Sequence, residues 1–194
     1  MKKFTNLVGG MMLIGITVFF QSCEPETMSL NEEPITTVDA TIERSSLVGR
    51  WELESMDSDV AVNLNFDESS STDILSETRC FDNMFYTFQA NGDVTTGQAK
   101  LDFGPEDDEF KCNYGEYSAS YDVNDQNELE VTFEYNGSTL TETKSISLYE
   151  EGTEEFMKVT LSEMEASAYV DDPGTTVASE IEEIIMVYKK VTIQ

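Results

Sequence analysis

The chain has 194 residues with 39 Asp and Glu, 11 Lys and Arg and no histidine, and its formal net charge is −28. With 39% hydrophobic residues it can build one packed core, so its acidity does not indicate general disorder. A polyanion has no cations to replace the counterions of nucleic acid, so we expect no nucleic-acid partner. The absence of histidine excludes Ser-His-Asp and Cys-His catalysis, and it excludes zinc sites that need imidazole.

Residues 1–22 have the pattern of a signal peptide. Lys2 and Lys3 precede an uncharged, mostly apolar run from residue 7 to residue 20. A membrane-spanning helix is the alternative interpretation, because a span needs about 20 apolar residues. Three glycines interrupt the run, and its strongly apolar part is short. The pattern therefore favours a cleaved signal over a span.

Ser22 and Cys23 resemble the end of a bacterial lipoprotein signal, in which a small residue precedes a cysteine that receives lipid. This resemblance implies cleavage before Cys23 and membrane attachment through a lipid on that cysteine. Glu24-Pro25-Glu26 is similar to the acidic signal that sends lipoproteins of the Bacteroidetes type to the outer face of the outer membrane. We therefore expect a bacterial outer-membrane protein that faces the cell exterior. The polar residues that follow, up to residue 46, predict a flexible tether.

Cys80 and Cys112 remain as a pair once Cys23 carries lipid. In an oxidising compartment this pair predicts a disulfide across a separation of 32 residues. A redox or metal role is disfavoured because there is no CxxC motif and no histidine to activate a thiol.

From residue 47 to residue 194 the hydrophobic pattern alternates with period two, which predicts half-buried β-strands. Asn91-Gly92 and Asn136-Gly137 lie between such runs and predict hairpins with type I′ turns, in which both central residues have positive φ. The predicted strands are residues 48–56, 59–66, 83–90, 93–101, 115–123, 128–135, 139–149, 155–162 and 184–192.

A meander of eight or nine strands avoids exposed edges most simply by closing. We therefore predict an all-β domain over residues 47–194, an antiparallel up-and-down barrel of about eight strands. Two stretches depart from the pattern, residues 68–79 with a short helix around 73–77, and residues 169–183. Either of them is a candidate to cover a barrel mouth.

Residues 122–127 prompt the question of calcium binding, because they are rich in Asp and Asn. The segment lacks the glycine and the bidentate glutamate of an EF-hand loop, so a hairpin loop is the preferred interpretation. We predict no metal site and no cofactor.

Leu47-Val48-Gly49-Arg50-Trp51 resembles the Gly-x-Trp opening of lipocalins and, more closely, of the lipocalin-like domain in Bacteroidetes lipoproteins. The resemblance covers residues 47–192 and includes both cysteines. It implies a lipocalin-like barrel in which Gly49 and Trp51 form a structural motif, with Trp51 plugging the base. Lipocalins also pack an arginine over this tryptophan, and since no arginine follows Arg79, Lys189 or Lys190 would have to replace it.

Two functions fit these features. The first is a binding module for a small, largely apolar ligand, held among aromatic side chains that share the strand faces predicted to point inward. The second is a structural or interaction lipoprotein with a solid core and no small ligand, whose protein partner the sequence does not identify. We expect no enzyme, because no pair of carboxylates stands apart. The candidate ligand-binding residues are Tyr86, Phe88, Tyr117, Tyr121, Phe133 and Tyr135.

Overall fold

The computed structural model describes residues 41–104, 109–135, 137–171 and 177–192. The predicted signal peptide, Cys23 and the tether up to residue 40 lie outside the described residues, so their roles stay predictions. The first described element starts at Arg44.

The described residues form ten strands, three short α-helices and one 3-10 helix. The elements are α1 (Arg44–Leu47), β1 (Gly49–Val62), β2 (Ser71–Asp73), α2 (Ile74–Glu77), β3 (Phe85–Phe88), β4 (Asp93–Gly104), β5 (Glu109–Val123), β6 (Glu128–Tyr135), β7 (Ser138–Glu151), β8 (Glu154–Ser162), α3 (Glu163–Ala166), β9 (Val170–Asp171), the 3-10 helix η1 (Val177–Glu180) and β10 (Glu183–Val191).

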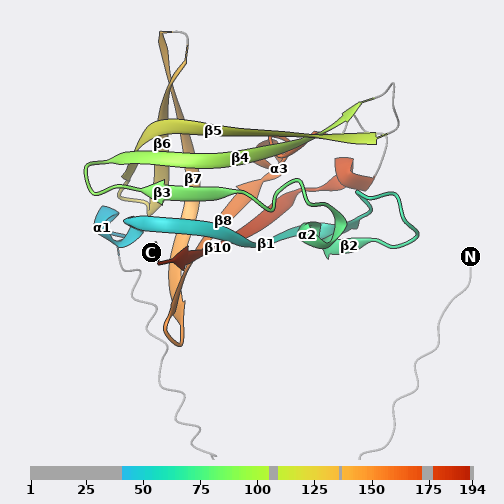
Figure 1. Ribbon diagram of the computed structural model, residues 1–194, viewed down its shortest axis with the longest axis horizontal. Coiled ribbons are helices and arrows are strands. Elements are labelled where there is room, and N and C mark those ends of the chain that lie inside the picture. Colours follow the sequence, from blue (N-terminus) through green and yellow to red (C-terminus); the bar gives the residue numbers. More distant parts are fainter. Residues whose placement is uncertain (1–40, 105–108, 136, 172–176, 193–194) are drawn as a thin grey trace, which may run out of the picture. The chain divides into compact units, whose positions relative to one another are not determined.

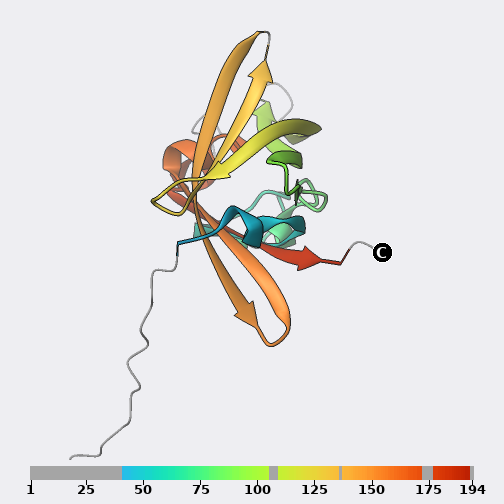
Figure 2. The ribbon, with the colours of Figure 1, turned by 90° about the vertical axis from the view of Figure 1, so that its left-hand side faces the viewer.

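Eight of these strands form a closed antiparallel barrel. Each pairs with the next in the order β1, β3, β4, β5, β6, β7, β8 and β10, and β10 pairs back with β1 (Figures 1 and 2). The closing register runs from Arg50↔Val191 to Ser58↔Ile184. Two short strands lie outside this ring, because β2 pairs with β1 and β9 pairs in parallel with β4. The predicted all-β, up-and-down barrel is confirmed.

β1 combines the two strands predicted near residues 48–56 and 59–66 into one. Trp51 is 1% exposed at an odd position, whereas Met56 and Val62, both fully buried, are at even positions. A register shift between Leu53 and Ser55 separates the two halves, and such a β-bulge moves the inward face by one residue. The apparent break in alternation is therefore a bulge and not a turn.

The β3–β4 hairpin turns at Asn91-Gly92 as predicted, but the predicted type I′ geometry is wrong. Gly92 has φ +94°, and Asn91 is not among the residues with positive φ. The Gly92 N–H donates to the carbonyl of Gln89 at 3.0 Å, which is the pattern of a longer loop with a single left-handed glycine. The tip of the β6–β7 hairpin includes Asn136, which lies outside the described residues.

The short helix predicted around residues 73–77 is α2. Asp73 caps its N-terminus, accepting a hydrogen bond from the Leu75 N–H at 3.0 Å. Beyond it, the predicted disulfide between Cys80 and Cys112 joins the loop before β3 to β5. The second irregular stretch supplies β9 and η1, and the Tyr169 carbonyl accepts from the Leu101 N–H at 2.7 Å. Both stretches lie at the end of the barrel away from α1, where β4 ends and β5 begins.

Candidate binding site

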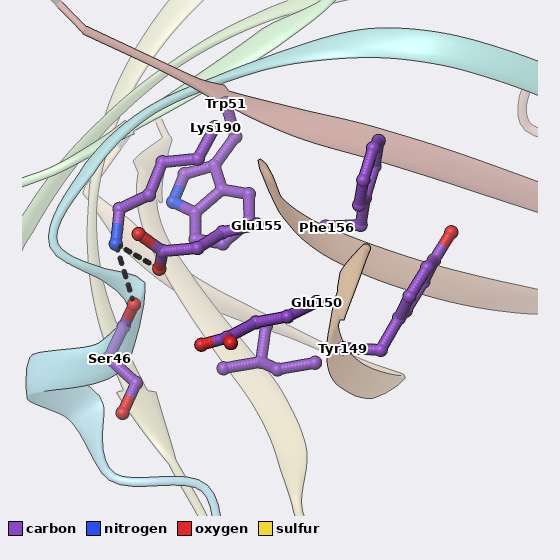
Figure 3. Close-up of a pocket in the computed structure, with 8 residues that line it drawn as sticks. Ser46, Trp51, Tyr149, Glu150, Glu155, Phe156 and Lys190 are labelled. Atoms are coloured by element: carbon purple, nitrogen blue, oxygen red, sulfur yellow. Dashed lines mark hydrogen bonds and ion pairs between the residues drawn. The ribbon is translucent and has the colours of Figure 1, made fainter. Parts of the chain in front are cut away.

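A cavity of about 310 Å³ lies at the end of the barrel that α1 approaches. Its walls come from four places: α1, the start of β1, the end of β10 and the β7–β8 hairpin (Figure 3). These segments meet because antiparallel neighbours bring the first residues of β1 and β8 beside the last residues of β10 and β7. The lining residues are Ser46, Trp51, Leu148, Tyr149, Glu150, Glu155, Phe156 and Lys190.

Trp51 forms the inner wall of this cavity and is fixed from two sides. Its indole Nε1 donates to the Leu47 carbonyl at 2.6 Å, which ties the end of α1 to β1. The Lys190 ammonium lies 5.1 Å from the centroid of the indole, within cation–π range. The side chain is only 1% exposed, as expected for the base of a barrel.

Lys190 takes the place that the lipocalin resemblance assigns to an arginine. Its Nζ also binds Glu155 Oε2 at 2.7 Å and the Ser46 carbonyl at 3.4 Å (Figure 3). Lys189 points to the opposite face of β10, where it pairs with Glu154 at 2.6 Å. That hydrogen bond raises the pKa of the Lys189 ammonium.

Two aromatic rings and a carboxylate complete the wall on the β7–β8 hairpin. Tyr149 and Phe156 are stacked with ring centroids 5.2 Å apart. Glu150 lies between them and the Lys190–Glu155 pair (Figure 3). It is exposed to solvent, and no hydrogen bond or ion pair to another described residue holds its carboxylate. The cavity thus offers aromatic and aliphatic surface beside an uncompensated negative charge, which suits a small ligand with an apolar body and a cationic or hydrogen-bond-donating group.

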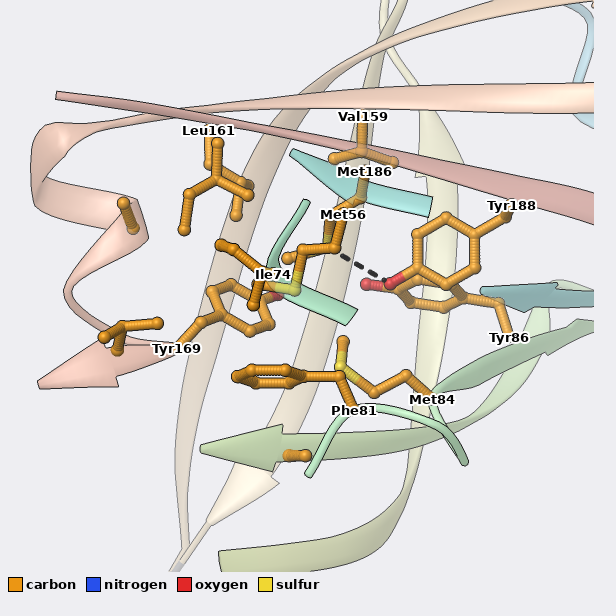
Figure 4. Packing of buried hydrophobic residues seen from close by; sticks show 14 of the residues in the cluster. Met56, Ile74, Phe81, Met84, Tyr86, Val159, Leu161, Tyr169, Met186 and Tyr188 are labelled. Atoms are coloured by element: carbon orange, nitrogen blue, oxygen red, sulfur yellow. Dashed lines mark hydrogen bonds between the residues drawn. The ribbon is translucent and has the colours of Figure 1, made fainter. Parts of the chain in front are cut away.

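Three of the six predicted ligand residues lie in the packed interior. Tyr86 stacks on Phe88 at 5.4 Å and meets Tyr188 edge-on at 5.2 Å, and Phe88 meets Tyr121 edge-on at 4.7 Å. All four are at most 4% exposed (Figure 4 shows Tyr86 and Tyr188 within the cluster). These rings contact one another, so the structure places them in the core and away from the cavity.

Of the other three predicted residues, Tyr117 is exposed and Phe133 is partly buried against the core. Tyr117 is 52% exposed and meets Phe133 edge-on at 6.5 Å. Tyr135 ends β6, and its side chain lies outside the described residues. The six residues therefore do not form one site, and their role in ligand binding stays a prediction.

A cluster of polar side chains lies in the barrel interior beside Tyr86. The Lys144 Nζ lies 3.2 Å from the Tyr169 hydroxyl and 3.6 Å from Glu142 Oε2. The Tyr86 phenol lies beside Tyr169, Lys144 and Gln98 in the same cluster. Burial raises the pKa of the Tyr86 and Tyr169 phenols well above the ordinary value of 10.0. These groups stay neutral at physiological pH and hold Lys144 in a largely apolar surrounding.

Sequence reasoning missed most of the cavity. Lys190 could have been found, because the Trp51 resemblance pointed to the two lysines near the chain end. The sequence around Tyr149, Glu150 and Phe156 does not indicate a binding site. These residues belong to the β7–β8 hairpin, which lies near α1 only once the barrel is closed.

The fold and site define a closed eight-strand antiparallel barrel with a small cavity at one end, an architecture compatible with a lipocalin-like fold. No protein-family model, no curated protein and no solved structure gives a significant match to this chain. Within the described ranges, no helix has the length and apolar character that crossing a membrane requires. The same residues contain no group of three or more Cys, Asp or Glu side chains arranged to hold a metal ion.

Proposed function

We propose that this protein is a lipid-anchored lipoprotein of a bacterial outer membrane, facing the cell exterior, whose barrel binds a small, largely apolar ligand. The signal pattern of residues 1–22 and the Ser22-Cys23 core support the anchor. The intact mass of the protein extracted from its own cells tests this part. Loss of residues 1–22 and a gain of lipid at Cys23 are expected, and an unmodified Cys23 would contradict it.

The observation that carries the binding proposal is the cavity beside Trp51. At about 310 Å³ it has the size of a small ligand site, and its wall combines an indole, Leu148 and two stacked rings. Because Lys190 is already paired with Glu155, the remaining charge in the cavity is that of Glu150. An amine or a hydroxyl on an apolar body complements this arrangement.

The alternative is a structural or interaction lipoprotein without a small ligand. The contacts among Tyr86, Phe88, Tyr121 and Tyr188 support a solid middle of the barrel, and they are the observation that favours it. Under either proposal the protein acts by binding and not by catalysis.

Trp51 is the only tryptophan of the chain, so its fluorescence reports on the cavity directly. We expect n-octylamine, n-octanol and octanoate, which share one chain and differ in head group, to change this fluorescence with different affinities. Octylamine should bind roughly threefold more tightly than octanol, the size of a partly exposed ion pair with Glu150, and octanoate should bind most weakly.

Glu150→Gln should remove the difference between octylamine and octanol. Glu151→Gln, on the same hairpin but outside the cavity lining, is the matched control and should keep that difference. The proposed site is wrong if none of the three compounds gives a saturable change. It is also wrong if both variants behave like the wild type.

A further inference from the structure

Strands β5 and β6 separate soon after they pair. β5 pairs with β4 along most of its length, from Ser120 back to Glu109. It pairs with β6 only through its last four residues, from Val123↔Leu129 to Ser120↔Thr132. In Figures 1 and 2 the β4–β5 ribbon and the β6–β7 hairpin extend in different directions beyond this point. Residues 112–119 of β5 therefore have no strand partner, among the described residues, on the edge that faces away from β4.

The backbone of this edge can accept another strand. Tyr121 donates its N–H to the carbonyl of Gly92, on the β4 side. Backbone groups of alternate residues in a strand point to opposite edges, so Ser118, Glu116 and Tyr114 direct their N–H and C=O groups away from β4. In the described part of the chain these groups have no hydrogen-bond partner. An unpaired row of this kind is the template for strand addition.

Apolar side chains lie where the two strands separate. Tyr117 is 52% exposed, and it contacts Phe133 of β6 across the separation. Leu140, the cross-strand neighbour of Phe133 on β7, is 56% exposed. Tyr117 and Leu140 face solvent, whereas Phe133 is partly buried, and a strand added at the β5 edge would cover the exposed apolar surface of all three.

The charged residues near the free edge of β5 indicate which kind of partner can bind there. Glu116 lies on β5 and Glu134 on β6, the two strands that separate, whereas Glu142 of β7 is already paired with buried Lys144 at 3.6 Å. A second copy of the chain would bring a further charge of −28 and be repelled. The segment between Cys23 and Arg44 is also acidic and contains no lysine or arginine.

We infer that the free edge of β5 binds an extended, basic peptide segment of another protein. The segment pairs with Tyr114–Ser118 as an additional strand, places apolar side chains on Tyr117, Phe133 and Leu140, and neutralises Glu116 and Glu134. No residue of β5 lines the cavity at Trp51, so this site is separate from that cavity.

The experiment uses three capped eight-residue peptides at physiological salt: alternating Lys-Val, alternating Glu-Val and alternating Lys-Pro. The Lys-Pro peptide keeps the charge but cannot form a β-ladder, so it separates strand pairing from simple attraction to an acidic protein. We expect only the Lys-Val peptide to bind, and it should slow amide hydrogen exchange at Tyr114, Glu116 and Ser118 roughly tenfold. The amides of Gly115 and Tyr117, already paired with β4, should not change.

Two variants complete the test. Ser118→Pro removes an N–H that points to the free edge and should weaken Lys-Val binding roughly tenfold, whereas Ser118→Ala keeps the N–H and should bind like the wild type. The exchange measurement on the wild type stands even if the proline variant does not fold. Equal binding of the Lys-Pro or Glu-Val peptide would overturn the inference, as would protection confined to other amides. If raising the protein concentration alone protected the same amides, the partner at this edge would be a second copy of the chain. That result would also overturn the inference of a basic peptide.

Discussion

Gly49 shows how single residues shape the end of the barrel that holds the cavity. Its φ is +131°, a conformation that residues with a side chain rarely adopt. An added Cβ would lie 3.1 Å from Cε of Lys190, the side chain that covers Trp51. Glycine at this position therefore permits both the entry into β1 and the close approach of the lysine.

We predict that Gly49→Ala lowers the free energy of unfolding by about 2–3 kcal/mol, since it combines backbone strain with a contact. Gly152→Ala is the matched control, because Gly152 has φ +67° and nothing within 4 Å of an added Cβ. It should cost about 1 kcal/mol. Urea unfolding followed by circular dichroism measures both, and equal losses would contradict this explanation of Gly49.

The strands differ in how well alternation predicts them. β6 has the predicted bounds, 128–135, and its inward residues Leu129 and Val131 are at most 1% exposed. The alternation pattern predicts two strands where the structure has β1, because the bulge moves the inward face by one residue. Amino-acid composition does not indicate a bulge. Alternation predicts Tyr117 and buried Tyr121 on the same face of β5. Tyr117 is nevertheless exposed, because β5 extends beyond the residues that pair with β6. Alternation reports a strand and its faces, but it does not report where a neighbouring strand ends.

The disulfide acts at the level of elements, joining the loop before β3 to β5. We predict that replacing both Cys80 and Cys112 by serine lowers the free energy of unfolding by about 4 kcal/mol, from the loop-closure entropy of the unfolded chain. Octylamine binding at Trp51 should persist under conditions where the variant is folded, because the disulfide lies at the opposite end of the barrel. Comparing urea unfolding with and without a reductant measures the loss, and a loss below about 1 kcal/mol would contradict it.

For the whole molecule, the sequence pattern was sufficient to predict a closed barrel but not the position of its cavity. The alternation pattern, the hairpin turns and the cysteine pair are local features of the sequence. They predict a row of antiparallel strands, and the need to avoid exposed edges then predicts a closed sheet. The cavity joins Ser46, Trp51, Leu148 and Lys190, residues that are distant in sequence and meet only after closure. The predicted aromatic residues were the strongest apolar signals, and the barrel uses three of them to fill its middle.

Buried phenols should make the whole barrel sensitive to alkali. Burial raises the pKa values of Tyr86, Tyr169 and Tyr188, whereas in the unfolded chain all three titrate near pH 10. Above that pH the unfolded state releases protons that the folded state keeps, so stability is unaffected at neutral pH and falls as pH rises. The slope for the three groups is roughly 4 kcal/mol per pH unit.

Unfolding free energies between pH 8 and pH 11 measure this slope. Tyr188→Phe should reduce it by about a third, because it removes one of the three phenols. The substitution should lower the free energy of unfolding little at neutral pH, since among the described residues the Tyr188 hydroxyl donates to the weak acceptor Met186 Sδ, at 3.4 Å. If absorbance at 295 nm showed all eight tyrosines of the folded protein ionising near pH 10, this prediction would fail.

The central claim is that the cavity beside Trp51 holds a small ligand. Native mass spectrometry of the full protein extracted from its own cells tests it most directly, with the Leu148→Trp variant, which fills the cavity, expressed in the same cells. We predict a discrete adduct of a few hundred daltons on the wild type, removable by organic solvent and absent from a folded Leu148→Trp protein. A wild type that carries no adduct, or an adduct kept equally by the variant, would contradict the claim and favour a structural or interaction role.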